Sequence, residues 1–161
     1  MQMEQAGTPA VEREFIFTTP VDRGLSYKLL DATHNKFANK VAECFKFLEK
    51  SVKRSKCEDL FVAEDLVKRV SLGQSHLWIA CEQEKIVGCF IIGFGSFPQG
   101  KGINAEAISG KFDFSVITPV VEKFYKALGF DFFEMTGRRG WERVMKPMGY
   151  EFKTITIRKR L

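Results

Sequence analysis

The sequence predicts one α/β domain with a central, twisted, mostly antiparallel sheet and helices on both faces. Apolar residues recur at helical spacing in three separate stretches. Between the second and third of these stretches lie two apolar runs that are typical of buried strands. The chain has 161 residues, of which 45% are hydrophobic and 28% charged, and this is the size and composition of a single globular domain spanning residues 1 to 161.

The N-terminal part is predicted to be an arm followed by a long helical region. Residues 1 to 24 form a polar arm in which Phe15-Ile-Phe17 is either a first strand or an anchoring segment. From Ser26 to about Ser55, apolar residues recur at steps of three, four and seven. This pattern predicts an amphipathic helix, or two helices joined near residues 33 to 35.

A second helix and a strand hairpin are predicted next. The helix runs from about Phe61 to Leu72, with Gly73 in the capping position. Residues 76 to 82 and 86 to 97 are predicted to be antiparallel strands joined by a turn at 83 to 85, the second of them apolar enough to be central in the sheet.

A third strand is predicted over residues 103 to 109, after a loop at 98 to 102. Strict alternation would place Asn104, Glu106 and Ile108 on one face and Ile103, Ala105 and Ala107 on the other. Glu106 would then be either an ordinary exposed strand residue or a carboxylate at a site.

The last third of the chain is predicted to add a helix, a parallel strand, a short helix and a closing strand. The first helix starts at Thr118-Pro119 or near Ser115, and Gly129 ends it. The parallel strand covers residues 131 to 136. A short helix from 141 to 148 follows, and the closing strand runs from 150 to 158 with a bulge near Phe152.

Positive charge is concentrated near the C-terminus. From Gly137 to Leu161, eight basic residues face two acidic ones, which gives +6, whereas the whole chain carries +5 and the first 136 residues therefore about −1. Such a segment suits an anionic partner. The candidate contact residues are Arg138, Arg139, Arg143, Arg158 and Arg160.

Cysteine and histidine usage argues against a metal site. Cys44, Cys57, Cys81 and Cys89 have no CxxC spacing, and we expect reduced, buried thiols. With two histidines in the chain, a histidine-based metal site is not expected. Neither a run of 18 apolar residues nor a signal-peptide pattern is present, so we expect a cytoplasmic protein that is neither secreted nor bound to a membrane.

The order of predicted elements resembles the GCN5-related N-acetyltransferase (GNAT) fold over roughly residues 59 to 161. Met148-Gly-Tyr-Glu151 is similar to the step that precedes the last strand of that fold. Two further stretches look like segments of small bacteriophage-encoded GNAT-like proteins, namely Leu77-Trp-Ile-Ala80 and Thr136-Gly-Arg-Arg-Gly-Trp141.

This resemblance implies an acetyl-coenzyme A site. The pantetheine would pair with the central strand at about residues 91 to 97, near Phe94 and Phe97, and the pyrophosphate would bind the loop from 109 to 115. The implied cofactor-binding residues in that loop are Gly110, Lys111 and Ser115. The loop departs from the family pattern because Phe112, Asp113 and Phe114 occupy places where phosphate oxygens would need room and donors.

The implied chemistry departs from the family as well. Active members often use a carboxylate on the central strand as base and a tyrosine in the last helix as acid. No Asp, Glu or His lies between Ile86 and Phe97, and Met145 holds the tyrosine's place. The remaining candidates for catalysis are Glu106, Glu134 and Tyr125.

Three functions follow from these features. The first is a bacteriophage GNAT-like protein, catalytically degenerate, that acts as a virion or protein-interaction component with phage or host proteins in the cytoplasm of the infected host. The second is an active acetyl-coenzyme A dependent N-acetyltransferase acting on an amine of a protein or small molecule. The third is nucleic-acid binding through the basic C-terminal third. The oligomeric state is left open.

Overall fold

The computed structural model describes residues 15–19, 24–30, 32–33, 35–56, 58, 60–137, 140–153 and 158–159. The strands are β1 (Phe15–Phe17), β2 (Leu25–Leu30), β3 (Ser75–Glu82), β4 (Lys85–Phe97), β5 (Gly100–Gly110) and β6 (Phe132–Met135). The helices are α1 (Phe37–Ser55), α2 (Ala63–Ser71), α3 (Phe114–Ala127) and α4 (Gly140–Met145), followed by the 3-10 turn η1 (Lys146–Met148). The predicted first strand is confirmed as β1.

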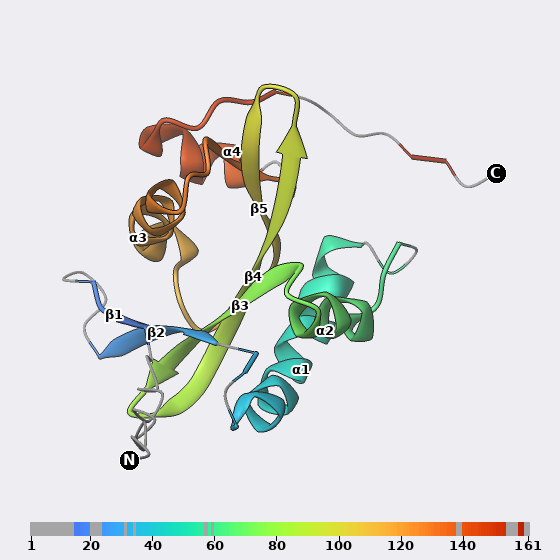
Figure 1. The fold of residues 1–161 in the computed structure, drawn as a ribbon, viewed down its shortest axis with the longest axis vertical. Helices are drawn as coiled ribbons and strands as arrows, with labels where there is room; N and C mark the ends of the chain where they lie inside the picture. The colour runs from blue at the N-terminus through green and yellow to red at the C-terminus, as the bar shows by residue number, and fades with distance from the viewer. Residues whose placement is uncertain are drawn as a thin grey trace, which may run out of the picture.

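The sheet keeps the strands in chain order, from β1 at one edge to β6 at the other. Every neighbouring pair up to β5 is antiparallel, and β6 joins β5 in parallel after the crossover through α3. Helices α1 and α2 cover one face and α3 covers the other (Figure 1). The predicted mixed, mostly antiparallel sheet with helices on both faces is therefore confirmed.

Each face of the sheet has its own core. On the α1 and α2 face, the helical residues at three- and four-residue spacing are Val41, Cys44, Leu48, Val52, Leu66 and Val70, which pack on Leu77, Ile79 and Ile91. On the α3 face, Phe114, Ile117, Val121 and Tyr125 pack on Trp78, Phe90 and Ile92. Burying one such aliphatic or aromatic side chain contributes about 1.5–3 kcal/mol, so these two layers fix the position of the strands.

The helix predicted from Ser26 is wrong in its first part. Residues 25–30 form β2, which pairs with β1 on one side and β3 on the other, and the helix begins only at Phe37. Tyr27 is fully buried in the α3-side core, and Leu29 lies opposite Trp78. An apolar pair such as Leu29-Leu30 fits a strand buried on both sides as well as it fits a helix.

The predicted turns and helix ends are mostly confirmed. Gln83 and Glu84 form the β3–β4 turn with positive φ values of 47° and 66°, and Gly73 and Gly129 follow α2 and α3 with positive φ. The earlier start of α3 is correct and the Thr118 start is wrong. Thr118 lies inside α3 and its hydroxyl donates to the Phe114 carbonyl at 2.8 Å.

The C-terminal region is confirmed in part. β6 is the predicted parallel strand, and α4 with η1 forms the predicted short helical segment. Residues 150–153 are not in a strand, whereas residues 154–157 lie outside the described part. The bulge predicted near Phe152 therefore has no described strand around it. Of the helices that the structure describes, none is both long and apolar enough to cross a membrane.

Candidate active site

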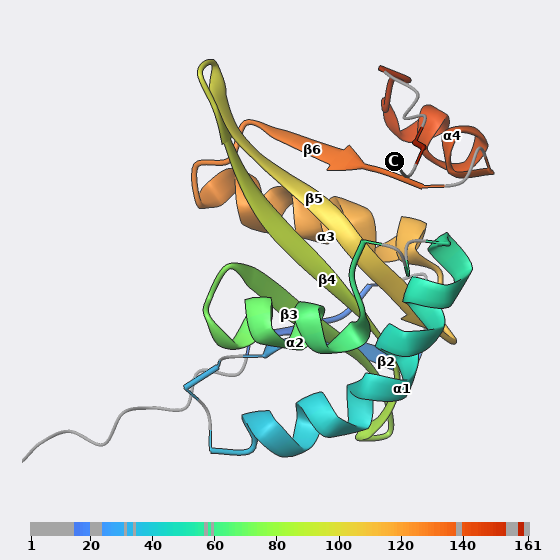
Figure 2. The same ribbon diagram turned by 90° about the vertical axis from the view of Figure 1, so that its right-hand side faces the viewer.

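Strands β5 and β6 pair over only four residues and then diverge. The parallel ladder joins Gly102–Ala105 to Phe132–Met135. Beyond Ala105, β5 continues to Gly110 and stays paired with β4 on its other side. The second half of β5 therefore borders an opening that leads to the start of α3 and to α4 (Figure 2).

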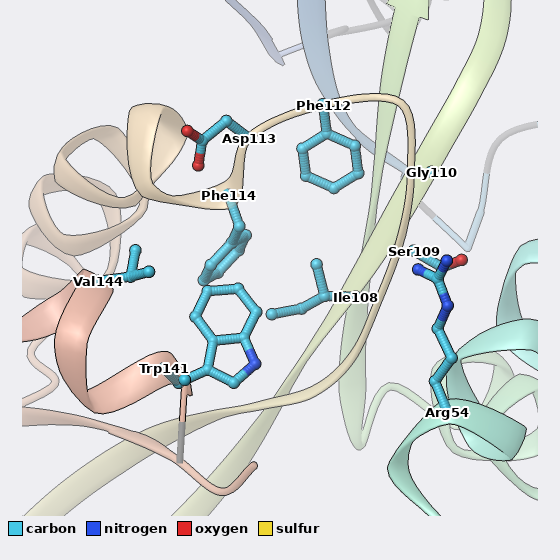
Figure 3. A pocket seen from close by; sticks show the side chains of 10 residues that line it. Arg54, Ile108, Ser109, Gly110, Phe112, Asp113, Phe114, Trp141 and Val144 are labelled. Atoms are coloured by element: carbon cyan, nitrogen blue, oxygen red, sulfur yellow. The ribbon is translucent and has the colours of Figure 1, made fainter. Parts of the chain in front are cut away.

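A cavity of about 490 Å³ lies at this opening. Its wall consists of Arg54 at the end of α1, Ile108, Ser109 and Gly110 of β5, Phe112, Asp113 and Phe114 at the start of α3, and Gly140, Trp141 and Val144 of α4 (Figure 3). The Trp141 indole meets the Phe114 ring edge to face, with centroids 6.1 Å apart. Trp141 also borders a larger groove of about 1590 Å³ along α3, β6 and α4, so its indole lies between the two spaces.

The N-terminus of α3 is capped by the chain's own carboxylate. Asp113 Oδ1 accepts a hydrogen bond from the Ser115 N–H at 2.9 Å and another from the Ser115 hydroxyl at 2.6 Å. A bound phosphate would use the same N–H groups and the same helix dipole. An anion approaching this helix end must therefore displace Asp113 and overcome its charge.

The loop before α3 is packed against β4. A Cβ at Gly88 would lie 2.7 Å from the Phe112 ring, and a Cβ at Gly110, where φ is +132°, would lie 2.2 Å from the Gly88 Cα. The Lys111 N–H donates to the Val87 carbonyl at 2.9 Å, and the residue is exposed. Close contact between loop and strand explains Gly110, so its cofactor role, like that of Lys111 and Ser115, stays a prediction.

Two polar groups of β5 face the region that a coenzyme A arm would enter. Ser109 is 4% exposed, and its hydroxyl is the one buried side-chain oxygen or nitrogen without a hydrogen-bond partner in the described part of the chain. The Ile108 N–H donates to Ser51 Oγ of α1 at 3.1 Å. The Ile108 N–H is therefore already bonded within the chain, whereas Ser109 and Arg54 line the cavity.

Glu106 is the extra residue of a β-bulge in β5. Ile91 pairs with Ala107, and the next residue, Ile92, pairs with Ala105, so Glu106 has no partner on β4. It is also the first residue of β5 beyond the ladder with β6. The bulge thus places one carboxylate at the point where the two strands separate.

The Glu106 carboxylate is buried and held from two sides. Ser75 Oγ donates to Oε2 at 2.9 Å, and the Arg69 guanidinium lies 2.7 Å from Oε1. The Glu106 side chain is only 7% exposed. Burial raises the pKa of the Glu106 carboxyl, while the Ser75 hydrogen bond and the Arg69 charge act in the opposite direction. Glu106 therefore accepts a proton more readily than an exposed glutamate does.

The bulge also corrects the predicted faces of this strand. Ala107 packs in the α1 and α2 core, whereas Ile103, Ala105 and Ile108 pack in the α3-side core. Strict alternation failed because one additional residue reverses the phase of every side chain after it. Of the two predictions for Glu106, an exposed strand residue is therefore wrong.

The strand beside the opening is β5, because β5 separates β4 from β6. The resemblance instead implies that pantetheine pairs with residues 91 to 97, which belong to β4. In the structure, Phe94 packs on His76 and Phe130 on the α3 face, and Phe97 is 50% exposed and packs on Phe132. Phe94 and Phe97 thus lie away from the cavity.

Tyr125 lies in the core of the α3 face. The Trp78 indole N–H donates to its hydroxyl at 3.0 Å, and His76 Nδ1 lies 2.9 Å from the same oxygen. Burial raises the Tyr125 pKa, so the phenol stays protonated. The tyrosine and the Glu106 carboxylate are on opposite faces of the sheet. Tyr125 therefore ties α3 to β3, and the structure does not bring the two candidates together.

Glu134, the third candidate, is exposed on β6 opposite Asn104. Its strand neighbours Phe133 and Met135 pack on the α3 side, so Glu134 points to the same face as Glu106. Glu106 and Glu134 therefore share one face of the sheet. Glu134 and Tyr125 both line the larger groove along α3, β6 and α4, whereas Glu106 does not.

The basic residues of the C-terminal third are described only in part. Arg143 and Arg158 are exposed, whereas Arg138, Arg139 and Arg160 lie outside the described residues. Their contact with an anionic partner stays a prediction.

The cysteines Cys44, Cys81 and Cys89 are free and buried, as predicted, and Cys57 lies outside the described residues. Burial raises the pKa of the Cys81 thiol. In the described part of the chain, no three His, Cys, Asp or Glu residues gather in a way that could hold a metal ion.

Sequence reasoning missed the residues that hold the site together, namely Arg69, Ser75 and Ser51. Arg69 lies on a helix face that reads as solvated, and the two serines have no motif around them. Each of these three residues contacts a residue of β5 that lies 31 to 57 positions away in the sequence, so no local pattern could have identified them.

Neither the models of known protein families nor the curated proteins match this sequence. Solved structures do match its fold. An aminoglycoside acetyltransferase from an uncultured soil metagenomic sample, in complex with sisomicin, superimposes with a TM-score of 0.63 at 13% identity, covering 88% of this chain and 99% of the other. A predicted acetyltransferase with acetyl-CoA from Clostridium acetobutylicum gives 0.59 at 12% identity, with 84% and 96% covered.

A GNAT family acetyltransferase from Staphylococcus aureus gives a TM-score of 0.55 at 18% identity, covering 86% of this chain and 99% of the other. These similarities confirm that the chain has the GNAT acetyltransferase fold. The organisms named for these neighbours provide no support for a bacteriophage origin.

Proposed function

We propose that this protein is an acyl-coenzyme A dependent N-acyltransferase in which Glu106 is the general base. The position of Glu106 carries the proposal. It is the first residue past the β5–β6 ladder, it is the extra residue of a bulge, and its buried carboxyl has a raised pKa. Perturbed carboxyl groups at a strand opening are frequent at catalytic sites.

The chain's own residues would act as follows. Glu106 accepts a proton from the ammonium group of the acceptor, which leaves an amine nitrogen able to attack a carbonyl carbon. Ser75 and Arg69 keep the carboxylate oriented while it waits for that proton. When bound, acetyl-coenzyme A supplies the thioester, so that a C–N bond forms, the C–S bond breaks and coenzyme A leaves. Met145 carries no acidic proton, so the second proton, which the nitrogen loses after the attack, would pass through water to the leaving sulfur.

Binding and turnover test this proposal separately. Titration calorimetry with acetyl-coenzyme A and free coenzyme A measures whether the opening accepts the cofactor. A thiol-release assay over a panel of amines then measures transfer. We expect Glu106→Gln to lower kcat by about 10²- to 10⁴-fold, the usual contribution of a general base. Glu49→Gln removes an exposed carboxylate of α1 and serves as the matched control with unchanged activity.

The proposal fails if no amine is acetylated while the cofactor binds, or if Glu106→Gln and Glu49→Gln behave alike. Activity at high pH should be less affected by Glu106→Gln, because a larger fraction of the acceptor then loses its proton to water.

A catalytically silent protein-interaction role is the second candidate. It is favoured by the capping of α3 by Asp113, by the packing of Phe112 over Gly88 and by the bond from the Ile108 N–H to Ser51. In each place the chain itself occupies a group that a cofactor would use. Absence of binding heat and of thermal stabilisation at millimolar acetyl-coenzyme A would favour this candidate over the enzyme.

The second candidate includes three more specific proposals: phage or host proteins as partners, a place in the virion, and nucleic-acid binding. A pull-down with the full chain and a salt titration of nucleic-acid affinity test them, since neutralising several phosphates makes the affinity fall steeply with salt.

A further inference from the structure

Three glycines of β4 and β5 lie beneath side chains on the same face of the sheet. A Cβ at Gly93 would lie 2.0 Å from Glu106 Oε1 and 2.6 Å from Asn104 Oδ1. A Cβ at Gly95 would lie 3.2 Å from the Phe97 ring, and a Cβ at Gly102 would lie 2.3 Å from the Phe132 ring. The missing side chains thus allow the Glu106 carboxylate and the two aromatic rings to approach the sheet closely, and we call these three side chains the sheet floor.

The sheet floor lies on the face of α1 and α2, beyond the ends of those helices. Figure 2 shows that α1 and α2 cover the lower part of β4 and β5, while the hairpin end and β6 rise above them without a helix on that side. Phe97 is 50% exposed and Phe132 is 37% exposed, and their ring centroids are 5.2 Å apart. Two neighbouring aromatic rings, tilted by 51° to each other and open to solvent, form an apolar patch that suits an apolar ligand group.

The other end of the sheet floor already holds a cation. The Arg69 guanidinium lies 2.7 Å from Glu106 Oε1, and the Arg69 side chain is 43% exposed. It reaches the carboxylate from α2 and can swing back into solvent. Glu134 points to the same face from β6, so the surroundings of Glu106 favour positive charge.

The two ends of the sheet floor are separated by a short length of strand. The Glu106 carboxylate lies over Gly93, and the two rings lie over Gly95 and its partner Gly102. Gly93 and Gly95 are two residues apart on β4, so the two ends are roughly 7 Å apart at about 3.3 Å per residue. A ligand that engages both ends must place its cation and its apolar group about that far apart.

We propose that the acceptor is a primary amine joined by a flexible chain to an apolar or aromatic group, with the ammonium replacing the Arg69 guanidinium at Glu106 and the apolar group on Phe97 and Phe132. This assignment of the substrate class rests on the proposed N-acyltransferase function. Arg69 then acts as a specificity-determining residue, because only a cation that competes with a guanidinium gains access to the carboxylate.

The test is a binding measurement without acetyl-coenzyme A. The probe is 3-phenylpropylamine, compared with the neutral 3-phenylpropan-1-ol and with the shorter benzylamine. The amide signals of Gly93, Gly95 and Gly102 in a ¹⁵N-labelled sample report binding at the sheet floor. At pH 8 we expect saturable shifts of all three signals with the long amine, and about tenfold weaker binding of the alcohol because it lacks the charge-assisted hydrogen bond.

Variants separate the two ends of the site. Phe97→Ala and Phe132→Ala remove exposed rings, so the fold should persist, and each should weaken the long amine by about fivefold. Arg69→Ala removes the competing guanidinium and should tighten binding by about threefold or more at pH 8, where a larger fraction of Glu106 is ionised. Lys68→Ala removes a neighbouring exposed charge of α2 and should leave the affinity unchanged.

A merely structural Arg69 would give unchanged or weaker binding in Arg69→Ala, and that result overturns the proposal. Equal shifts with amine and alcohol also overturn it. Shifts that appear on raising the protein concentration alone would assign the aromatic patch to a second copy of the chain instead. If the amine binds as expected but is never acetylated, the N-acyltransferase function fails while the binding site stands.

Discussion

The Asp113 carboxylate accepts two hydrogen bonds from Ser115, one from its backbone N–H at 2.9 Å and one from its hydroxyl at 2.6 Å. This pair closes the N-terminus of α3 with a negative charge that belongs to the protein. The site that a helix dipole would offer to a phosphate is thus occupied before any ligand arrives. Whatever binds in the adjacent cavity must rely on other donors, of which the buried Ser109 hydroxyl is one.

Replacing Asp113 separates capping from charge. Asp113→Asn keeps a side-chain oxygen that caps α3 and removes the negative charge, so we expect acetyl-coenzyme A to bind about three- to tenfold more tightly with little loss of stability. Asp113→Ala should destabilise the fold by about 1 kcal/mol. Calorimetry and urea unfolding measure the two effects. Equal affinity of wild type and Asp113→Asn would mean that the phosphate does not approach this helix end.

The buried Glu106 carboxyl should make stability depend on pH. Because burial raises its pKa in the folded state, the folded protein binds more protons than the unfolded chain between the ordinary value near 4.5 and the raised value. The contribution of Glu106 is therefore present below pH 4.5 and is lost as pH rises through the raised pKa. In urea unfolding from pH 4 to 8, the free energy of unfolding should decline less with rising pH in Glu106→Gln than in the wild-type protein. Identical pH profiles of the two proteins would contradict the burial.

The strands β3 and β4 could be predicted because their apolar runs are long and are joined by turn residues. The position of Glu106 could not be derived, since the bulge that places it at the end of the β5–β6 ladder depends on how Ile91 and Ile92 pair with Ala107 and Ala105. Nothing in the local sequence distinguishes a regular strand from one with an extra residue here. The resemblance pointed to residues 91–97 of β4, whereas β5 is the strand that borders the opening, and which of two neighbouring strands does so is a property of the assembled sheet.

The glycines of the sheet floor should differ in their tolerance of alanine. Gly93→Ala places a methyl group 2.0 Å from the Glu106 carboxylate, which Arg69 and Ser75 hold in place, so we expect a loss of about 1–3 kcal/mol. Gly95→Ala meets only the far edge of the exposed Phe97 ring at 3.2 Å, and this ring can move aside. Its cost should stay within about 0.5 kcal/mol. Thermal or urea unfolding of both variants measures the two losses, and equal losses would mean that the Glu106 carboxylate is not held in one position.

The Tyr125 hydroxyl should matter for stability more than for catalysis. Tyr125→Phe leaves the buried Trp78 indole N–H and His76 Nδ1 without this partner, and we expect a loss of about 1–3 kcal/mol in the free energy of unfolding. The rate of any acyl transfer, measured below the unfolding transition, should change little. A large fall in kcat with unchanged stability would return Tyr125 to the list of catalytic candidates.

The N-terminal half shows where periodicity misleads. Leu29 and Leu30 continued the apolar spacing of α1, and only the partners on both sides, β1 and β3, make residues 25–30 a strand. The core positions Val41, Leu48 and Val52 of α1 itself follow from spacing alone. Spacing therefore identified the residues that face a core, and the structure decided which core and which element.

The strands lie in the sheet in the same order as along the chain, and this order determines which strand separates from the sheet most easily. Five strands are joined by antiparallel ladders between neighbours, and three of these ladders span six to ten residue pairs. β6 is attached to β5 by four pairs only, after a crossover through α3. Amide hydrogens of β6 should therefore exchange with solvent long before those of β3 and β4. During synthesis, the ladders up to β5 can form first, and the opening takes shape when β6 arrives.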